Sequence, residues 1–79
     1  MSDFKELLDR LGHRKEGERF TAVRALVGLG AAASPACPEL IQMLLDYSWP
    51  VVDSAMWALE SSGEAGVTAL LHALERGAP

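Results

Sequence analysis

The chain aligns with itself at an offset of 33 residues, and this internal repeat constrains the fold more than any other feature. The alignment needs no gap between Phe4 and Gly63. The matched pairs are mainly leucines and alanines at helical spacing: Glu6 with Glu39, Leu7 with Leu40, Leu11 with Leu44, Ala22 with Ala55, Ala25 with Ala58, Leu26 with Leu59 and Gly30 with Gly63. A repeated helical hairpin keeps its residue types on buried faces and at helix ends. The sequence therefore predicts stacked hairpins that cover each other's apolar faces.

Five segments carry the spacing of amphipathic helices, in which apolar residues recur at i, i+3, i+4 and i+7. Four of them span about residues 3–11, 18–29, 50–61 and 64–76. The third lies between them and begins either at Ser34 and Pro35 or at Pro38, whose ring removes an early backbone hydrogen bond. No segment alternates apolar and polar residues as a strand does, so we expect no sheet.

Each expected helix contributes one apolar stripe to the core. The stripes are Phe4, Leu7, Leu8 and Leu11; Ala22, Ala25, Leu26 and Leu29; Leu40, Ile41, Leu44 and Leu45; Val51, Ala55, Ala58 and Leu59; and Val67, Leu70, Leu71 and Leu74. Gly30 and Gly63 follow two of the helices, at positions where a left-handed residue commonly ends a helix. Because the fifth segment repeats the first-helix pattern, we expect the array to end on a half repeat that caps it.

Length and composition fit one small folded domain that covers residues 1–79. The chain is 49% hydrophobic and 23% charged, which is typical of a globular protein with a thin core. Its net charge of −4 disfavours nucleic acid and anionic membranes as partners. No uninterrupted apolar run approaches the roughly 20 residues that cross a bilayer. The single cysteine, Cys37, and the lack of a basic-then-apolar leader favour the cytoplasm.

Two parts of the chain resemble HEAT repeats. Residues 38–46 read PELIQMLLD and are followed at residues 51–59 by VVDSAMWAL, a pattern similar to the short bacterial repeats named after phycobilisome lyases. Residues 22–30 read AVRALVGLG and resemble the end of another unit. The resemblance implies a short right-handed α-solenoid of about five helices. Repeat one would cover about residues 4–36, repeat two about residues 37–66, and a half repeat residues 67–79.

The resemblance also implies a polar contact between repeats. HEAT-like units commonly carry an Asp in the turn between their helices and an Arg six positions further on. Asp46 fills the acid position of repeat two, where Val52 replaces the base. Arg19 fills the base position of repeat one, where His13 replaces the acid. We therefore expect Arg19 and Asp46 to approach across the repeat junction, and the alternative is that both side chains are solvated.

Apolar residues also occur on the side of the second helices that is expected to face outward. They are Phe20, Val23, Val27, Met56 and Trp57. Met and Trp are enriched in protein–protein interfaces, and in HEAT arrays the second helices line a shared surface. We expect this surface to bind a partner or a second copy of the chain. The alternative is that termini or loops, including Trp49, fold over it as part of the core.

The sequence offers little for catalysis or for binding a cofactor. His13 and His72 have no His or Cys at i+3 or i+4, so neither begins a metal site on a helix. Cys37, beside Pro38, is expected to be a small buried apolar residue, although a position at a helix start could also favour its thiolate. No glycine-rich phosphate loop follows a strand. We therefore expect no catalytic residue, no metal and no cofactor.

These observations favour a protein–protein interaction module, such as an adaptor, a regulatory subunit or an inhibitor, over an enzyme. Two alternatives remain open. The similarity to lyase-type repeats implies an accessory role in attaching tetrapyrroles such as bilins. The basic cluster that runs from His13 to Arg24 permits weak binding of nucleic acid, and it comprises His13, Arg14, Lys15, Arg19 and Arg24.

Overall fold

A computed structural model describes residues 4–76, and this part of the chain consists of helices and turns without a strand. The prediction of an all-α protein is confirmed. The elements in chain order are α1 (Phe4–Leu11), α2 (Glu16–Leu29), the 3-10 helix η1 (Gly30–Ala36), α3 (Cys37–Met43), α4 (Trp49–Ser61) and α5 (Glu64–Glu75). The expected helix start at residue 3 lies outside the described residues.

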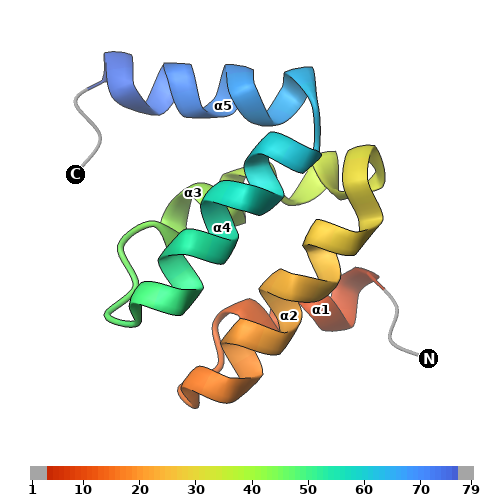
Figure 1. Ribbon diagram of the computed structural model, residues 1–79, viewed down its shortest axis with the longest axis vertical. Helices are drawn as coiled ribbons and strands as arrows, with labels where there is room; N and C mark the ends of the chain where they lie inside the picture. Colours follow the sequence, from red (N-terminus) through yellow and green to blue (C-terminus); the bar gives the residue numbers. More distant parts are fainter. Residues whose placement is uncertain (1–3, 77–79) are drawn as a thin grey trace.

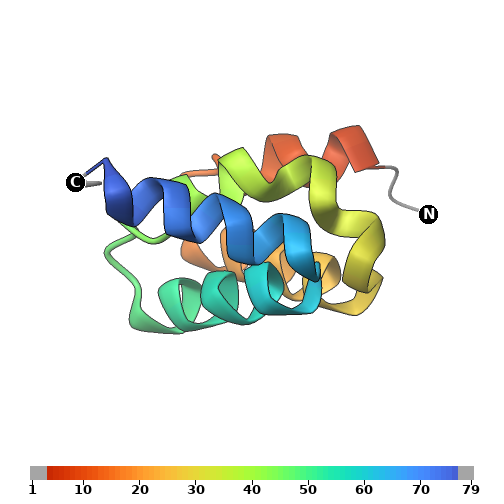
Figure 2. The same ribbon diagram turned by 90° about the horizontal axis from the view of Figure 1, so that it is seen from above.

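The helices form two layers, with α1, α3 and α5 in one layer and α2 and α4 in the other (Figure 2). α2 and α4 run side by side and share the most extensive contact between two helices of the described chain (Figure 1). The molecule measures 34 × 26 × 17 Å. Its shortest dimension suits two layers of helices whose axes lie about 8–10 Å apart.

The structure decides between the two expected starts of the third helix. η1 occupies Gly30–Ala36, and α3 begins at Cys37 with Pro38 in its first turn, where the missing N–H costs no bond within the helix. α3 ends at Met43. Leu45, which was expected in its buried stripe, therefore lies beyond the helix and is 54% exposed.

Gly30 and Gly63 occupy equivalent places in the two hairpins. Gly30 directly follows α2, and Gly63 stands between α4 and α5. Their φ angles are +57° and +82°, values that glycine adopts without the steric cost that a Cβ atom imposes. Their ψ angles of −129° and −146° lie outside the left-handed helical region, so the expected need for glycine is confirmed but the expected left-handed helical cap is not.

The core lies between the two layers. Leu7 and Leu11 of α1 close one end of it, and Phe4 and Leu8 pack against it in partly buried positions. Burying a side chain of this size contributes about 1.5–3 kcal/mol to folding. The largest fully buried side chains come from α2, α3 and α4: Leu26, Leu40, Leu59, Val23 and Val51.

The buried arc of α2 matches the expected one at Ala22 and Leu26, which are wholly buried, and differs from it elsewhere. Ala25 and Leu29 are exposed, Leu29 by 41%, whereas Val23 is wholly buried. The reason is that α2 packs against both α1 and α4, so its buried arc includes the side toward α4. Ala58 in the second hairpin is the equivalent of Ala25 in the first. It is wholly buried because the first hairpin packs against α4 on the side where Ala58 lies.

Of the apolar stripe expected to be buried in α5, only Leu70 packs against the core, in a partly buried position. α5 instead buries Gly66 and Ala73. A Cβ atom at Gly66 would lie 1.8 Å from the carbonyl oxygen of Leu59, so this glycine determines how closely α5 approaches α4. The absence of a side chain at Gly66 therefore permits the close contact between the two helices. The stripe residues left exposed are Val67, Leu71 and Leu74.

By length and composition alone, Glu16–Leu45 meets the requirements of a membrane-crossing helix, which differs from the expectation above. In the structure this run is divided among α2, η1 and α3, and the chain passes from one layer to the other (Figure 2). Apolar residues within it, including Leu26 and Leu40, are wholly buried in the core. The core helices of a folded domain can produce the same composition.

Candidate interaction surface

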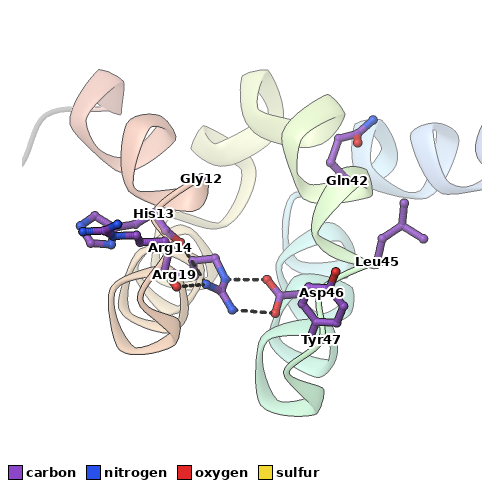
Figure 3. A pocket seen from close by; sticks show the side chains of 8 residues that line it. All are labelled: Gly12, His13, Arg14, Arg19, Gln42, Leu45, Asp46 and Tyr47. Atoms are coloured by element: carbon purple, nitrogen blue, oxygen red, sulfur yellow. Dashed lines mark hydrogen bonds and ion pairs between the residues drawn. The ribbon is translucent and has the colours of Figure 1, made fainter.

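The structure brings Arg19 and Asp46 together across the junction between the two hairpins. The Nε atom of Arg19 donates to Oδ2 of Asp46 at 2.6 Å, and its Nη2 atom donates to Oδ1 at 3.0 Å. The Nη1 atom donates to the backbone carbonyl groups of His13 and Arg14. The two charged side chains are only 15% and 8% exposed. This bidentate pair ties the α1–α2 turn to the α3–α4 turn (Figure 3).

The surroundings of Asp46 lower the pKa of its carboxyl group below the ordinary value of 3.8. Burial alone raises this pKa, but it is outweighed by hydrogen bonds from Arg19 and from the backbone N–H of Ser48, together with the Arg19 charge. The hydrogen bond to Asp46 in turn raises the pKa of Arg19. The Ser48 hydroxyl also donates to the carboxylate of Glu16, which adds a second polar link across the junction.

An open depression of about 570 Å³ lies beside this pair. Two of its charged side chains, Arg19 and Asp46, are already neutralised by each other. Small-molecule sites are usually enclosed and combine apolar walls with a few free polar groups, and this depression lacks that form. Figure 3 shows its lining, which consists of Gly12, His13, Arg14, Arg19, Gln42, Leu45, Asp46 and Tyr47.

We call the outward side of α2 and α4 the second-helix face, and it consists of Phe20, Arg24, Val27, Met56 and Trp57. The guanidinium carbon of Arg24 lies 4.6 Å from the centroid of the Trp57 ring and 5.9 Å from that of Phe20. Trp57 is 46% exposed and Met56 is 40% exposed, whereas Phe20 and Val27 pack half-buried against the core. Arg24 therefore links α2 to α4 by cation–π contacts on the surface.

Val23 was predicted to be a binding residue, and the structure shows that this prediction is wrong. It is wholly buried because it lies on the side of α2 that α4 covers. Met56, its equivalent at the 33-residue offset, is exposed because no described helix covers the corresponding side of α4. Arg24 was missing from the prediction, although its spacing of four from Phe20 puts both on one side of a helix. Trp49 is itself 73% exposed, so it is not packed as a cover over this surface.

The side chains with the greatest potential for chemistry do not meet in an accessible site. Cys37 is buried, as expected of a small apolar residue, and its Sγ atom lies 3.6 Å from Oγ of Ser62. His13 and His72 are exposed on separate elements. Within residues 4–76, no three side chains of His, Cys, Asp or Glu are placed to hold a metal ion.

The basic cluster from His13 to Arg24 is partly engaged within the protein. Arg19 pairs with Asp46, and Arg24 lies over the Trp57 ring. His13, Arg14 and Lys15 remain exposed in the α1–α2 turn. The surface that this cluster presents is therefore smaller than its sequence suggests.

The fold and its surface define a broad class, a small all-helical protein with large apolar side chains exposed on α4. Comparison with protein-family models, with curated proteins and with solved structures found no match to this chain. The function of this chain is therefore proposed from the positions and contacts of its own residues.

Proposed function

We propose that this chain is a protein–protein interaction module that binds a partner, or a second copy of itself, through the second-helix face. The observation that carries the proposal is the exposure of two large apolar side chains, Met56 and Trp57, next to each other on α4. Covering such side chains contributes about 25 cal/mol for each Å² of apolar surface removed from water. Tryptophan is also among the residues that contribute most to binding energy in interfaces.

Arg24 makes Trp57 a pre-organised anchor for binding. Its guanidinium group lies over the indole ring, and this attraction favours the Trp57 rotamer that keeps the contact. A side chain that is already ordered avoids an entropic cost of about 0.5–1.5 kcal/mol when a partner binds. The half-buried side chains of Phe20 and Val27 extend the apolar surface from α4 onto α2.

We also propose the finer architecture of the chain, which is a short right-handed α-solenoid of HEAT-like hairpins capped by a half repeat. Repeat one would cover about residues 4–36, repeat two about residues 37–66, and the half repeat would begin at residue 67. The two-layer arrangement and the positive φ angles of Gly30 and Gly63 support it. The ion pair between Arg19 and Asp46, at the positions that the HEAT-like pattern implies, supports it further.

We propose no catalytic role, because the thiol of Cys37 is buried and the exposed His13 and His72 lie on separate elements. Nucleic-acid binding is less well supported than protein binding, since Arg19 and Arg24 make contacts within the chain. No feature of the described residues favours a role in tetrapyrrole attachment. The cytoplasm is the location that we propose.

Photo-crosslinking in the source cell tests the proposed face directly. A photoactivatable phenylalanine analogue replaces Trp57 in one variant and Trp49 in the control, because Trp49 is also exposed and belongs to the same helix. We expect a crosslinked partner, or a crosslinked dimer, from position 57 and not from position 49. Equal crosslinking at both positions, or none at position 57, would contradict the proposal.

The combined substitution Met56→Glu and Trp57→Lys gives an independent test by loss of binding. Both side chains are exposed, so the variant should retain the helical circular dichroism of the parent protein. The partner found by crosslinking, or a dimer seen by light scattering, should be lost. A folded double variant that keeps the partner would show that the binding site lies elsewhere.

A further inference from the structure

Within residues 4–76, no helix covers the side of the molecule beyond α4 and α5, and we call this side the open end. α2 covers one side of α4, and no described helix covers the opposite side (Figure 1). The exposed fractions of its large apolar side chains are 40% for Met56, 48% for Val67, 54% for Leu71 and 67% for Leu74. The open end consists of Val52, Met56 and Glu60 from α4 and Val67, Leu71 and Leu74 from α5.

Equivalent residues in the first hairpin show what the open end lacks. Val23, the equivalent of Met56, is wholly buried, and Val27, the equivalent of Glu60, is half-buried. In α1, Leu11 is 3% exposed although its equivalent in α5, Leu74, is 67% exposed. The second hairpin covers these positions in the first. The open end therefore presents a surface that, one unit earlier, is covered by a helical hairpin.

The stripe on α5 faces away from the neighbouring helix α3. Ala73 and Arg76 line a groove against Pro38 and Ile41 of α3. At about 100° per residue, Leu74 lies roughly 160° around the helix from Arg76. Leu74 and the rest of the stripe are therefore directed toward the open end rather than toward α3.

The charges around the open end are acidic. Asp53, Glu60, Glu64 and Glu75 are all exposed, and α4 contains neither Lys nor Arg. Among the described residues, none of these four acids has an ion-pair partner. A symmetric contact between two copies would bring the same acidic surface face to face. The charge therefore favours a basic partner over a second copy.

We propose that the open end binds an amphipathic helix of another protein whose apolar stripe is flanked by Lys or Arg. The bound helix would take the place beside α4 that α4 itself takes beside α2. Within the chain, α4 packs against α2, and the buried residues of α4 include the small side chains of Ser54 and Ala58. The open end shares only Met56 with the second-helix face, so Leu71 and Trp57, which each belong to one surface alone, distinguish the two proposals.

A peptide based on α4 is the probe for this surface. It copies residues 49–61 and carries Lys in place of Asp53 and Glu60, whereas the matched control peptide retains both acids. We expect the Lys peptide to saturate the protein in a fluorescence-anisotropy titration and to bind at least about tenfold more tightly than the control at low salt. Added salt should reduce this difference.

Two protein variants with equally exposed positions identify the site. Leu71→Lys introduces a repelling charge into the stripe, and Leu45→Lys makes the same change at the α3–α4 turn, where the leucine is also 54% exposed. We expect Leu71→Lys to weaken binding of the Lys peptide at least about tenfold. Leu45→Lys and Trp57→Lys should bind it like the parent protein.

Three results would overturn the proposal. The first is the absence of binding by the Lys peptide, and the second is equal binding by the parent protein and Leu71→Lys. The third is a doubling of the 8.5 kDa mass of the free protein that Leu71→Lys abolishes, because the open end would then be covered by a second copy. Leu71→Lys tests the open end and Trp57→Lys tests the second-helix face. If one proposal fails, the other can therefore still be tested.

Discussion

Arg19 and Asp46, 27 positions apart in the sequence, form a bidentate ion pair that joins the two hairpins. Each group is largely shielded from water, so neither can exchange its partner for solvent without a cost. Because Arg19 also holds the carbonyl groups of His13 and Arg14, one side chain organises its own turn and fastens the next one.

Asp46→Ala should destabilise the protein, because it leaves Arg19 without its counter-charge and removes the acceptor for the Ser48 N–H. Hydrogen bonds to charged groups contribute about 1.5–3 kcal/mol, and we expect a loss of this order in the free energy of unfolding. Urea unfolding followed by circular dichroism measures it. Asp9→Ala, at an exposed acid of α1, is the control and should change stability by less than about 0.5 kcal/mol. Equal losses in both variants would contradict a special role for the pair.

The contribution of Asp46 should depend on pH with a defined sign. Its folded-state pKa lies below the ordinary value of 3.8, so near and below that pH the unfolded state binds more protons than the folded state. The stabilisation should be complete above pH 3.8 and decline as the pH falls through the lower, folded-state pKa. Unfolding free energies of the parent and Asp46→Ala, measured as a function of pH, should converge below pH 3.8. A constant difference at low pH would show that ionisation of Asp46 is not responsible.

Arg24→Met should release the Trp57 ring, because it keeps an unbranched apolar chain but removes the charge that lies 4.6 Å from the ring centroid. Exposed cation–π contacts contribute about 0.5–1 kcal/mol, so the loss in stability should be small. In a Trp49→Phe background, Trp57 is the sole tryptophan, and its fluorescence anisotropy should fall in the variant. Arg14→Met, at the exposed α1–α2 turn, should leave the anisotropy unchanged.

Gly66→Ala should destabilise the contact between α4 and α5, since its Cβ atom would overlap the carbonyl oxygen of Leu59. Overpacking of this kind costs about 1–3 kcal/mol. Gly28→Ala is the matched control, because no atom lies within 4 Å of the added Cβ and alanine favours the helix by about 0.5–1 kcal/mol. Thermal unfolding should therefore move in opposite directions for the two variants. A stabilised Gly66→Ala would show that α5 can shift without cost.

The features that follow from the repeat were predictable from the sequence. The spacing of apolar residues predicted a helical protein, and the equivalent glycines predicted the positive φ angles at Gly30 and Gly63. The approach of Arg19 and Asp46 was implied by the resemblance to HEAT-like repeats, which commonly carry an Asp and an Arg at these positions. The helices and the glycine positions depend on local backbone preferences, and the ion pair depends on the register between the two hairpins. Residue types and their spacing along the chain carry information about both.

The candidate site was only partly predictable, as Val23 and Met56 illustrate. Both are apolar residues at equivalent positions on a second helix, yet one is wholly buried and the other is 40% exposed. The same contrast separates Leu11 from Leu74. A repeat pattern assigns equivalent residues the same side of their helices. It does not state whether another helix lies on that side.

The sequence by itself determined the helical class and the positive φ angles of the glycines between helices, because these depend on residue type and spacing. The resemblance to HEAT-like repeats indicated the register that pairs Arg19 with Asp46. Only the tertiary structure decided that Val23 is core, that Arg24 lies over Trp57, and that no described helix covers the exposed apolar side chains of α4 and α5. The physical reason is that burial is a property of neighbours. A side chain loses its contact with water only where another element packs against it, and that arrangement belongs to the whole fold.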